Sequence, residues 1–187
     1  GVNCWPGSPR HVPAEARAAL LREIPPARRV AVTVNPTPAE AAALIADGFA
    51  IVQAHFDPSQ DACDPAALSA KIGVAALWLA PKLADGAAWP ESLMPLAAGF
   101  VHDAHAKDAF GGTGRRADWD RFTSLRTRFP QKTWILAGGL GPDNVVAATA
   151  TGATFLDLNS GVEISPGLKS AEKLSVVADG LLKIAQS

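Results

Sequence analysis

The chain of 187 residues contains only two cysteines, Cys4 and Cys63, with no C-x-x-C pair and no cluster of histidine and cysteine. A disulfide framework needs several paired cysteines, and a structural zinc site needs four suitably spaced ligands. The sequence therefore predicts neither kind of site, and we expect no bound metal and no cofactor.

The chain also lacks an excess of charge of one sign and any long apolar run. Its net charge is -1, with 48% hydrophobic and 19% charged residues, which is typical of a single globular domain, here spanning residues 1–187. Balanced charge gives no drive toward nucleic acid or an anionic membrane, and no run approaches the about 20 apolar residues of a membrane span. Without a basic-plus-apolar leader, we expect a cytoplasmic protein with a small-molecule ligand.

Short apolar runs alternate with helical patterns along the chain. Seven runs predict strands, at residues 2–5, 29–35, 49–54, 74–80, 100–103, 133–137 and 154–158. Helices are predicted from Thr37-Pro38-Ala39-Glu40, which is a capping box, after Asp64-Pro65, at 118–128 and 141–149, and on one apolar face between Leu174 and Ala185. Strict alternation predicts a parallel sheet with right-handed crossovers, covered by helices.

Two glycine turns follow consecutive strands, Gly138-Gly139 first and Ser160-Gly161 second. Glycine lets an anion approach the backbone, and the last two strand-to-helix loops of a (β/α)8 barrel are a frequent phosphate site. The alternative is that these glycines only permit turns with positive φ. Two such turns on successive units favour the phosphate site over that alternative.

Several motifs together resemble the phosphoribosylanthranilate isomerase family, across nearly the whole chain from Trp5 onward and in the family's order. They are CWPGSPRHV near the start, VQAH at 52–55, FGGTGRRADW at 110–119, LAGGLGPDNV at 136–145 and LNSGVEISPG at 158–167. The resemblance implies an α/β fold of the (β/α)8 TIM-barrel type, with the active site at the carboxyl ends of the strands. It implies the Amadori rearrangement of N-(5-phosphoribosyl)anthranilate in tryptophan biosynthesis.

The resemblance also implies that one part of the family pattern lies outside this chain. Family members begin with a strand reading K-[IV]-C-G, whose cysteine is the general base, and seven of the eight βα units are recognisable here. The unit of about 30 residues before them is absent from the sequence. We expect the resulting open strand edges to favour sheet contraction or a homo-oligomer, because unpaired edges and uncovered apolar surface recruit partners.

Four side chains take substrate roles by this resemblance. Asp103, which ends the run FVHD, would be the general acid that protonates the ribose ring oxygen, and Arg10 would bind the anthranilate carboxylate. Asp157 would lie near the anthranilate ring, and His55 matches the family histidine, although Ala54 and Phe56 replace its usual neighbours. The alternative, non-catalytic interpretations are that Asp103 caps a turn, that Arg10 is a solvated loop residue and that His55 is a hydrogen-bonded residue at the rim.

The phosphate is expected among backbone groups. The resemblance assigns it to the residues Gly112, Gly114, Gly138, Gly139, Ser160 and Gly161. Glu163 and Lys169 match the family's SGVE and PG-x-K motifs, for which structural capping is favoured. The general base has no counterpart; Cys4 stands at the end of a predicted strand, but a small buried hydrophobe is the favoured interpretation of it.

The sequence is compatible with three functions. The leading one is phosphoribosylanthranilate isomerase; the second is a catalytically inactive relative that binds a phosphorylated ligand. The third is a sugar-phosphate isomerase of a neighbouring barrel family, which the WPGSPR motif disfavours.

Overall fold

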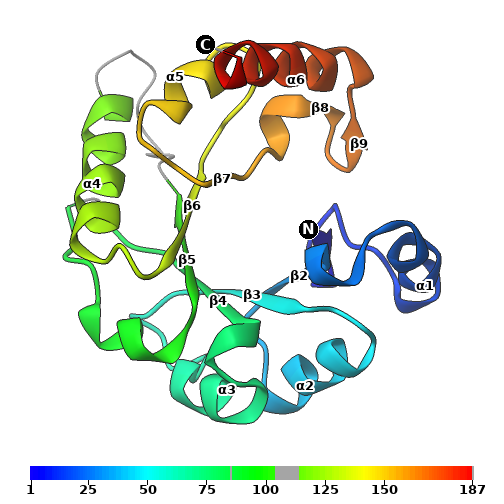
Figure 1. Ribbon diagram of the computed structural model, residues 1–187. Helices are drawn as coiled ribbons and strands as arrows, with labels where there is room; N and C mark the ends of the chain where they lie inside the picture. The colour runs from blue at the N-terminus through cyan, green and yellow to red at the C-terminus, as the bar shows by residue number, and fades with distance from the viewer. Residues whose placement is uncertain (85, 104–113, 187) are drawn as a thin grey trace. The chain divides into compact units, whose positions relative to one another are not determined.

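The computed structural model describes residues 1–84, 86–103 and 114–186, with the backbone alone for residues 114–118. The chain forms two compact units, Gly1–Phe100 and Val101–Ser187. Strands and helices alternate along each unit, from blue to green in the first and from green to red in the second (Figure 1). Within the described ranges, no helix has the length and apolarity needed to cross a membrane.

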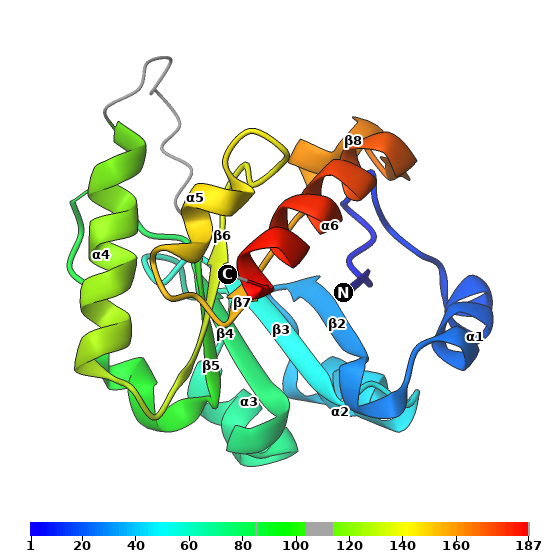
Figure 2. The same cartoon turned by 45° about the horizontal axis from the view of Figure 1, so that its top comes forward.

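The first unit is a parallel sheet whose strands pair in chain order. Its strands are β1 (Val2–Asn3), β2 (Val30–Val34), β3 (Ile51–Phe56), β4 (Leu77–Pro81) and the beginning of β5 (Gly99–Asp103). The helices between them are α1 (Ala14–Glu23), α2 (Pro38–Ala46) and α3 (Pro65–Ile72), and α2 and α3 lie on one face of the sheet (Figure 2). Because the strands are parallel, their carboxyl ends share one edge.

Local sequence explains where these helices begin. Thr37 accepts a hydrogen bond from the backbone N–H of Glu40, whose carboxylate in turn accepts from the N–H of Thr37, so the predicted capping box is confirmed. The Asp64 carboxylate accepts from the N–H groups of Ala66 and Ala67 at the start of α3, which is also as predicted.

The second unit contains a parallel strand pair and a small hairpin. The strands β6 (Thr133–Ala137) and β7 (Phe155–Leu156) are parallel, while β8 (Glu163–Ser165) and β9 (Leu168–Lys169) are antiparallel. Its helices are α4 (Gly114–Arg128), α5 (Val145–Thr149), the short 3-10 turn η4 (Ser160–Val162) and α6 (Ala171–Ala185). The turn η4 therefore stands directly between β7 and the hairpin.

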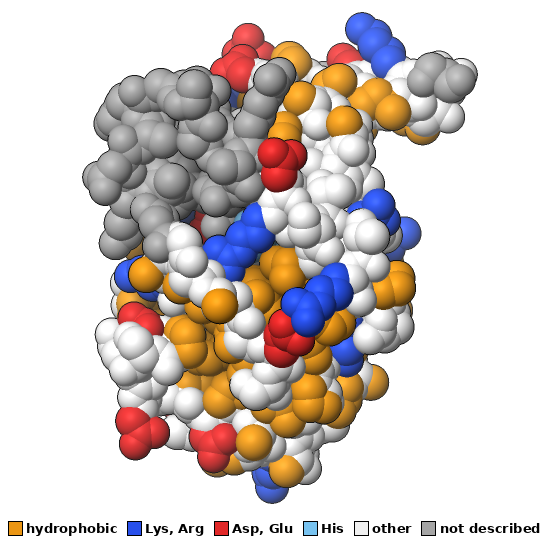
Figure 3. Space-filling view, turned by 90° about the vertical axis from the view of Figure 1, so that its left-hand side faces the viewer, with side chains coloured by type: hydrophobic (Ala, Val, Ile, Leu, Met, Phe, Trp, Pro, Cys, Tyr) orange, Lys and Arg blue, Asp and Glu red, His pale blue; other side chains and the backbone are white. Residues whose placement is uncertain are grey.

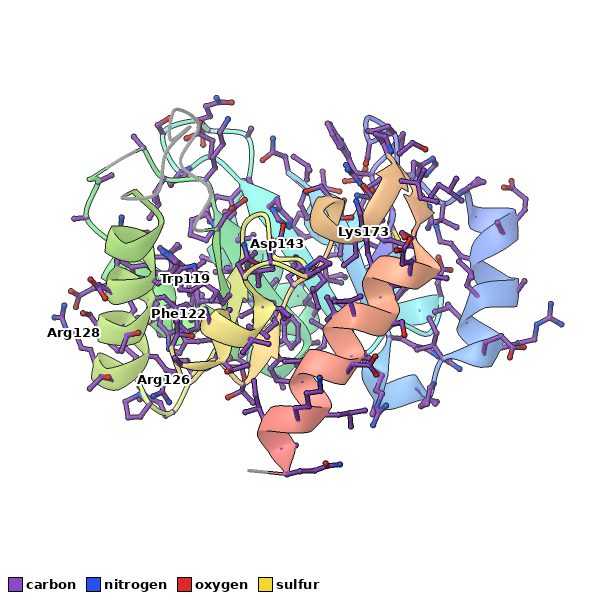
Figure 4. The ribbon with its side chains drawn as sticks, turned by 90° about the horizontal axis from the view of Figure 1, so that it is seen from above. Trp119, Phe122, Arg126, Arg128, Asp143 and Lys173 are labelled. Carbon is purple, nitrogen blue, oxygen red and sulfur yellow. The ribbon has the colours of Figure 1, made fainter. Side chains whose placement is uncertain are left out.

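Aromatic side chains fix α4 against β6. Phe122 is fully buried and packs edge-to-face on Trp134, with ring centroids 6.4 Å apart, and its ring lies 6.2 Å from that of His102 on β5. Figure 4 shows Phe122 on the inner side of α4 and Arg128 on the outer side. Such aromatic pairs stabilise beyond the area they bury, so this cluster sets the position of α4.

Helix α6, which the sequence predicts between Leu174 and Ala185, buries only part of its apolar face. Val177 packs with Val145 and Val162, but Leu174 and Leu182 are 41% and 58% exposed. The helix therefore leaves apolar side chains partly exposed beside the buried Val177.

Several element boundaries also differ from the prediction. The strand predicted at 49–54 is shifted. The backbone N–H of Phe49 donates to the carbonyl oxygen of Leu44 at the end of α2, and the strand starts at Ile51. Helix α5 begins at Val145, not at Gly141, because residues 141–144 form a separate turn. Helix α1 and the hairpin β8–β9 were not predicted, and the proline-interrupted segment 83–98 contains a 3-10 helix at Glu91–Leu96.

Candidate active site

In the first unit, Arg10 lies in the loop that follows β1 at the carboxyl edge of the sheet. The backbone N–H of Arg10 donates to the hydroxyl oxygen of Ser8 over 3.1 Å, which closes a local turn within the segment SPR. The residue is half-buried. Sequence resemblance assigns its guanidinium group to the binding of a carboxylate. Both groups are planar, so a guanidinium can bind a carboxylate through two parallel hydrogen bonds.

His55 lies two strands away at the same edge of the first unit, as the fifth residue of β3. Its Nε2 atom lies 2.9 Å from Nε2 of Gln53, whose side chain points to the same face of the sheet. Gln53 is only 5% exposed, so its amide is held rigidly and fixes the orientation of the imidazole. Sequence reasoning missed Gln53, although its spacing of two from His55 on a strand was a usable signal.

In the second unit, Asp103 is the last residue of β5 and is exposed. The strand end places a carboxyl group at the carboxyl edge, as predicted. The next described residue is Gly114, which begins α4, whereas Gly112 lies outside the described residues.

Asp157 directly follows β7, and its backbone N–H donates to the carbonyl oxygen of Leu136 on β6 over 2.8 Å. This bond extends the strand pairing by one residue and brings the Asp157 side chain to the carboxyl end of the β6–β7 pair. Asp157 is half-buried, not enclosed within a strand.

The turn after β6 is held by an asparagine that sequence reasoning did not single out. Gly138 and Gly139 have φ values of 102° and 63°, a region that favours glycine. Asn144 accepts from the N–H of Gly141 over 2.9 Å, and its amide donates to the carbonyl oxygen of Gly139 over 3.1 Å. The signal for this role was the motif GGLGPDN, in which an asparagine follows a glycine turn.

The second glycine turn lies against the first. A Cβ atom on Gly141 would lie 2.9 Å from the carbonyl oxygen of Gly161, and one on Gly161 would collide with the carbonyl group of Leu140. The two backbones can approach this closely only because both positions are glycine. The fold therefore brings together the two turns that the sequence singled out.

These adjacent turns also expose backbone donors. Within the part of the chain that the structure describes, the N–H groups of Gly139, Ser160 and Gly161 have no protein acceptor. By contrast, the N–H of Gly141 is already used by Asn144. Unused backbone N–H groups can donate hydrogen bonds to an anion such as phosphate.

The cysteines do not fit a general base. Cys4 is 7% exposed, and burial raises the pKa of its thiol above the usual value, against a smaller lowering by the charge of Arg17. Burial likewise raises the pKa of Cys63 to about 11. Both thiols are therefore protonated near neutral pH, and the interpretation of Cys4 as a small buried hydrophobe is supported.

The described side chains form neither a metal site nor, on the face shown in Figure 3, a surface of uniform charge. Across the described ranges, no group of three or more His, Cys, Asp or Glu residues is arranged to hold a metal ion. On the face that Figure 3 presents, basic and acidic side chains are scattered among hydrophobic and uncharged ones.

Comparison with known proteins identifies the family of the chain. The family model described as N-(5'phosphoribosyl)anthranilate (PRA) isomerase matches residues 3–179. An N-(5'-phosphoribosyl)anthranilate isomerase of Nitrosomonas eutropha is 34% identical over 97% of this chain and 84% of its own length. The isomerase of Bordetella avium is 32% identical over 98% of this chain and 85% of its own.

Solved structures give the fold class. The crystal structure of phosphoribosyl anthranilate isomerase from Thermus thermophilus superposes with a TM-score of 0.75 at 27% identity, covering 98% of this chain and 87% of that one. The fold is thus of the α/β TIM-barrel type, with seven parallel strands among the described residues. The chain belongs to the N-(5'-phosphoribosyl)anthranilate isomerase family, whose members isomerise this sugar phosphate in tryptophan biosynthesis.

Proposed function

We propose that the substrate phosphate binds between the turns at Gly138-Gly139 and Ser160-Gly161. The observation that carries this proposal is the close approach of Gly161 to Leu140 and Gly141, which brings together two turns that carry unused N–H groups. Backbone donors bind a phosphate through charge-assisted hydrogen bonds and need no cationic side chain. We also assign Gly112 and Gly114 to the phosphate site, because they belong to a glycine motif that the family shares.

Asp103 is the proposed general acid. The carboxyl group delivers its proton to the ribose ring oxygen as the C1–O bond breaks, and the nitrogen lone pair forms the C1=N bond. Removal of the C2 proton then leaves an electron pair that forms C1=C2, while the electrons of C1=N return to nitrogen. The resulting enol becomes the ketone when its hydroxyl proton is lost and C1 is protonated. The position of Asp103 at the end of β5 supports this role.

The anthranilate end of the substrate is assigned to three side chains. Arg10 binds the carboxylate, His55 is oriented by Gln53 toward a substrate polar group, and Asp157 lies by the ring. The removal of the C2 proton is assigned to no described side chain, because both thiols are protonated near neutral pH.

One experiment tests the phosphate assignment. Backbone amide NMR spectra are recorded while inorganic phosphate is added, and turnover of N-(5'-phosphoribosyl)anthranilate is measured with phosphate as competitor. We expect shifts at Gly139, Ser160 and Gly161 and competitive inhibition. Shifts that avoid all three amides would overturn the assignment.

We also propose that the two units form one barrel domain, because the family match runs across both of them. A homo-oligomer is supported by the exposed apolar side chains on α6, and the isomerase of Thermotoga maritima, solved as monomers generated from it, is described as dimeric. Tryptophan biosynthesis supports a cytoplasmic location. Sedimentation equilibrium of the wild type and of Leu182→Glu tests the assembly: an equal, monomeric mass for both would contradict it.

A further inference from the structure

An ion pair between a buried carboxylate, Glu163, and a partly exposed ammonium group, Lys169, stands directly beside the proposed phosphate turn. Glu163 begins β8, one residue after η4, and its side chain is only 4% exposed. Its Oε1 atom lies 2.9 Å from Nζ of Lys169 and also accepts from the backbone N–H of Gly167 over 3.2 Å. A carboxylate this buried is stable only when paired and hydrogen-bonded, so Lys169 is held in place by it.

The ammonium group of Lys169 also reaches back to the turn itself. Besides Glu163, Nζ donates to the side-chain oxygen of Asn159 over 2.8 Å and to its backbone carbonyl oxygen over 3.1 Å. An ammonium has three donors, and these three acceptors use all of them. Lys169 therefore connects a buried carboxylate to the residue immediately before Ser160, and no donor remains for a ligand.

Further bonds tie the same two segments together. Lys173, at the start of α6, donates from Nζ to the carbonyl oxygen of Glu163 over 2.8 Å, and it lies beside this segment in Figure 4. The N–H of Ser170 donates to the carbonyl oxygen of Val162 over 2.8 Å. The backbone after the turn is thus anchored by Ser170 and Lys173, whereas the backbone before it is anchored by Lys169.

We propose that Lys169, oriented by Glu163, is a positioning residue that holds Asn159, and with it the N–H groups of Ser160 and Gly161, in the arrangement that binds phosphate. The inference rests on the proposed phosphate site. Preorganised donors bind an anion without the entropic cost of ordering the loop, so release of Asn159 lowers affinity without removing any contact to the anion. The hairpin β8–β9 brings Glu163 and Lys169 together across the sheet pair.

The test compares Lys169→Met with Lys183→Met, which removes the same charge from the last turn of α6. The measurements are the dissociation constant for inorganic phosphate and hydrogen exchange at Ser160 and Gly161. We expect Lys169→Met to weaken phosphate binding roughly tenfold and to speed exchange at both amides, whereas Lys183→Met leaves both unchanged. Equal losses in the two variants would mean that long-range charge attraction acts, and would overturn the inference.

Two milder variants keep the test decisive if Lys169→Met unfolds. Asn159→Ala removes the side-chain acceptor alone, and Glu163→Gln weakens the hold on Lys169; each should weaken phosphate binding about threefold. The two changes should be less than additive when combined, because both act through Lys169. Wild-type affinity in these variants, or reduced stability with unchanged affinity, assigns the ion pair a structural role only. If wild-type protein shows no phosphate effect at Ser160 and Gly161, the proposed phosphate site fails, which is a separate result.

Discussion

Gly161 and Leu140 are in backbone contact, so that a Cβ atom on Gly161 would lie 2.8 Å from the carbonyl carbon of Leu140. The contact joins the turn after β7 to the turn after β6 within one unit. It explains why glycine is needed at position 161, where φ is not positive and the constraint is space.

Gly161→Ala should separate these turns. The added methyl group meets backbone atoms, which cannot move aside as a side chain would, so the turn at Ser160 must shift. We expect phosphate affinity to fall at least tenfold, with a loss of about 1–3 kcal/mol in the free energy of unfolding. Titration with inorganic phosphate and urea unfolding measure the two effects. Gly180→Ala, on α6 of the same unit, is the control, and equal phosphate affinity in the two variants would contradict the prediction.

Asp103→Asn should abolish isomerase turnover while leaving substrate binding nearly unchanged. The amide retains the shape of the carboxyl group but has no acidic proton to deliver to the ring oxygen. Single-turnover kinetics and a binding titration separate the two steps. Turnover within a few-fold of the wild type would remove Asp103 from the role of general acid.

Asn144→Ala should loosen the turn after β6. It loses both the acceptor for the Gly141 N–H and the donor to the Gly139 carbonyl. We expect phosphate affinity to fall by about fivefold to tenfold, because each lost hydrogen bond costs about 1 kcal/mol. Asn144→Asp keeps the acceptor and should lose less. Equal phosphate binding by the alanine variant and the wild type would show that the turn keeps its shape without the two hydrogen bonds of the Asn144 side chain.

The Cys63 thiol should make stability fall in alkaline solution. Its pKa is raised by burial to about 11 in the folded chain, against 9.0 for an ordinary thiol. Between these values the unfolded state releases its proton first, so the free energy of unfolding decreases as pH rises from about 9 to about 11. The chain has no tyrosine, so no phenol titrates in this window.

Urea unfolding of the wild type and of Cys63→Ala at about pH 8 and about pH 10.5 measures this effect. The wild type should lose more stability than the variant between the two conditions. Lysine titration is common to both proteins and cancels in the comparison. Parallel losses would show that Cys63 does not contribute.

Local sequence determined the starts of α2 and α3 and the presence of most strands. The capping box at Thr37 and the cap at Asp64 were predicted because each depends on a few neighbouring residues. Strand β6 was predicted with its observed bounds for the same reason. Strand β3 was shifted because an apolar residue, Phe49, packs under the end of α2, and a window of sequence does not distinguish that packing from strand pairing.

The sequence by itself determined the family, the alternation of strands and helices, and the two glycine turns, because motifs and hydrophobic periodicity are local in the chain. Only the tertiary structure decided that Gly161 contacts Leu140, that Gln53 holds His55, that Asn144 clasps the first turn and that Glu163 is buried against Lys169. These relationships depend on hydrogen bonds, pairing and close packing in three dimensions. Residue type and spacing alone do not specify which side chain fills which space.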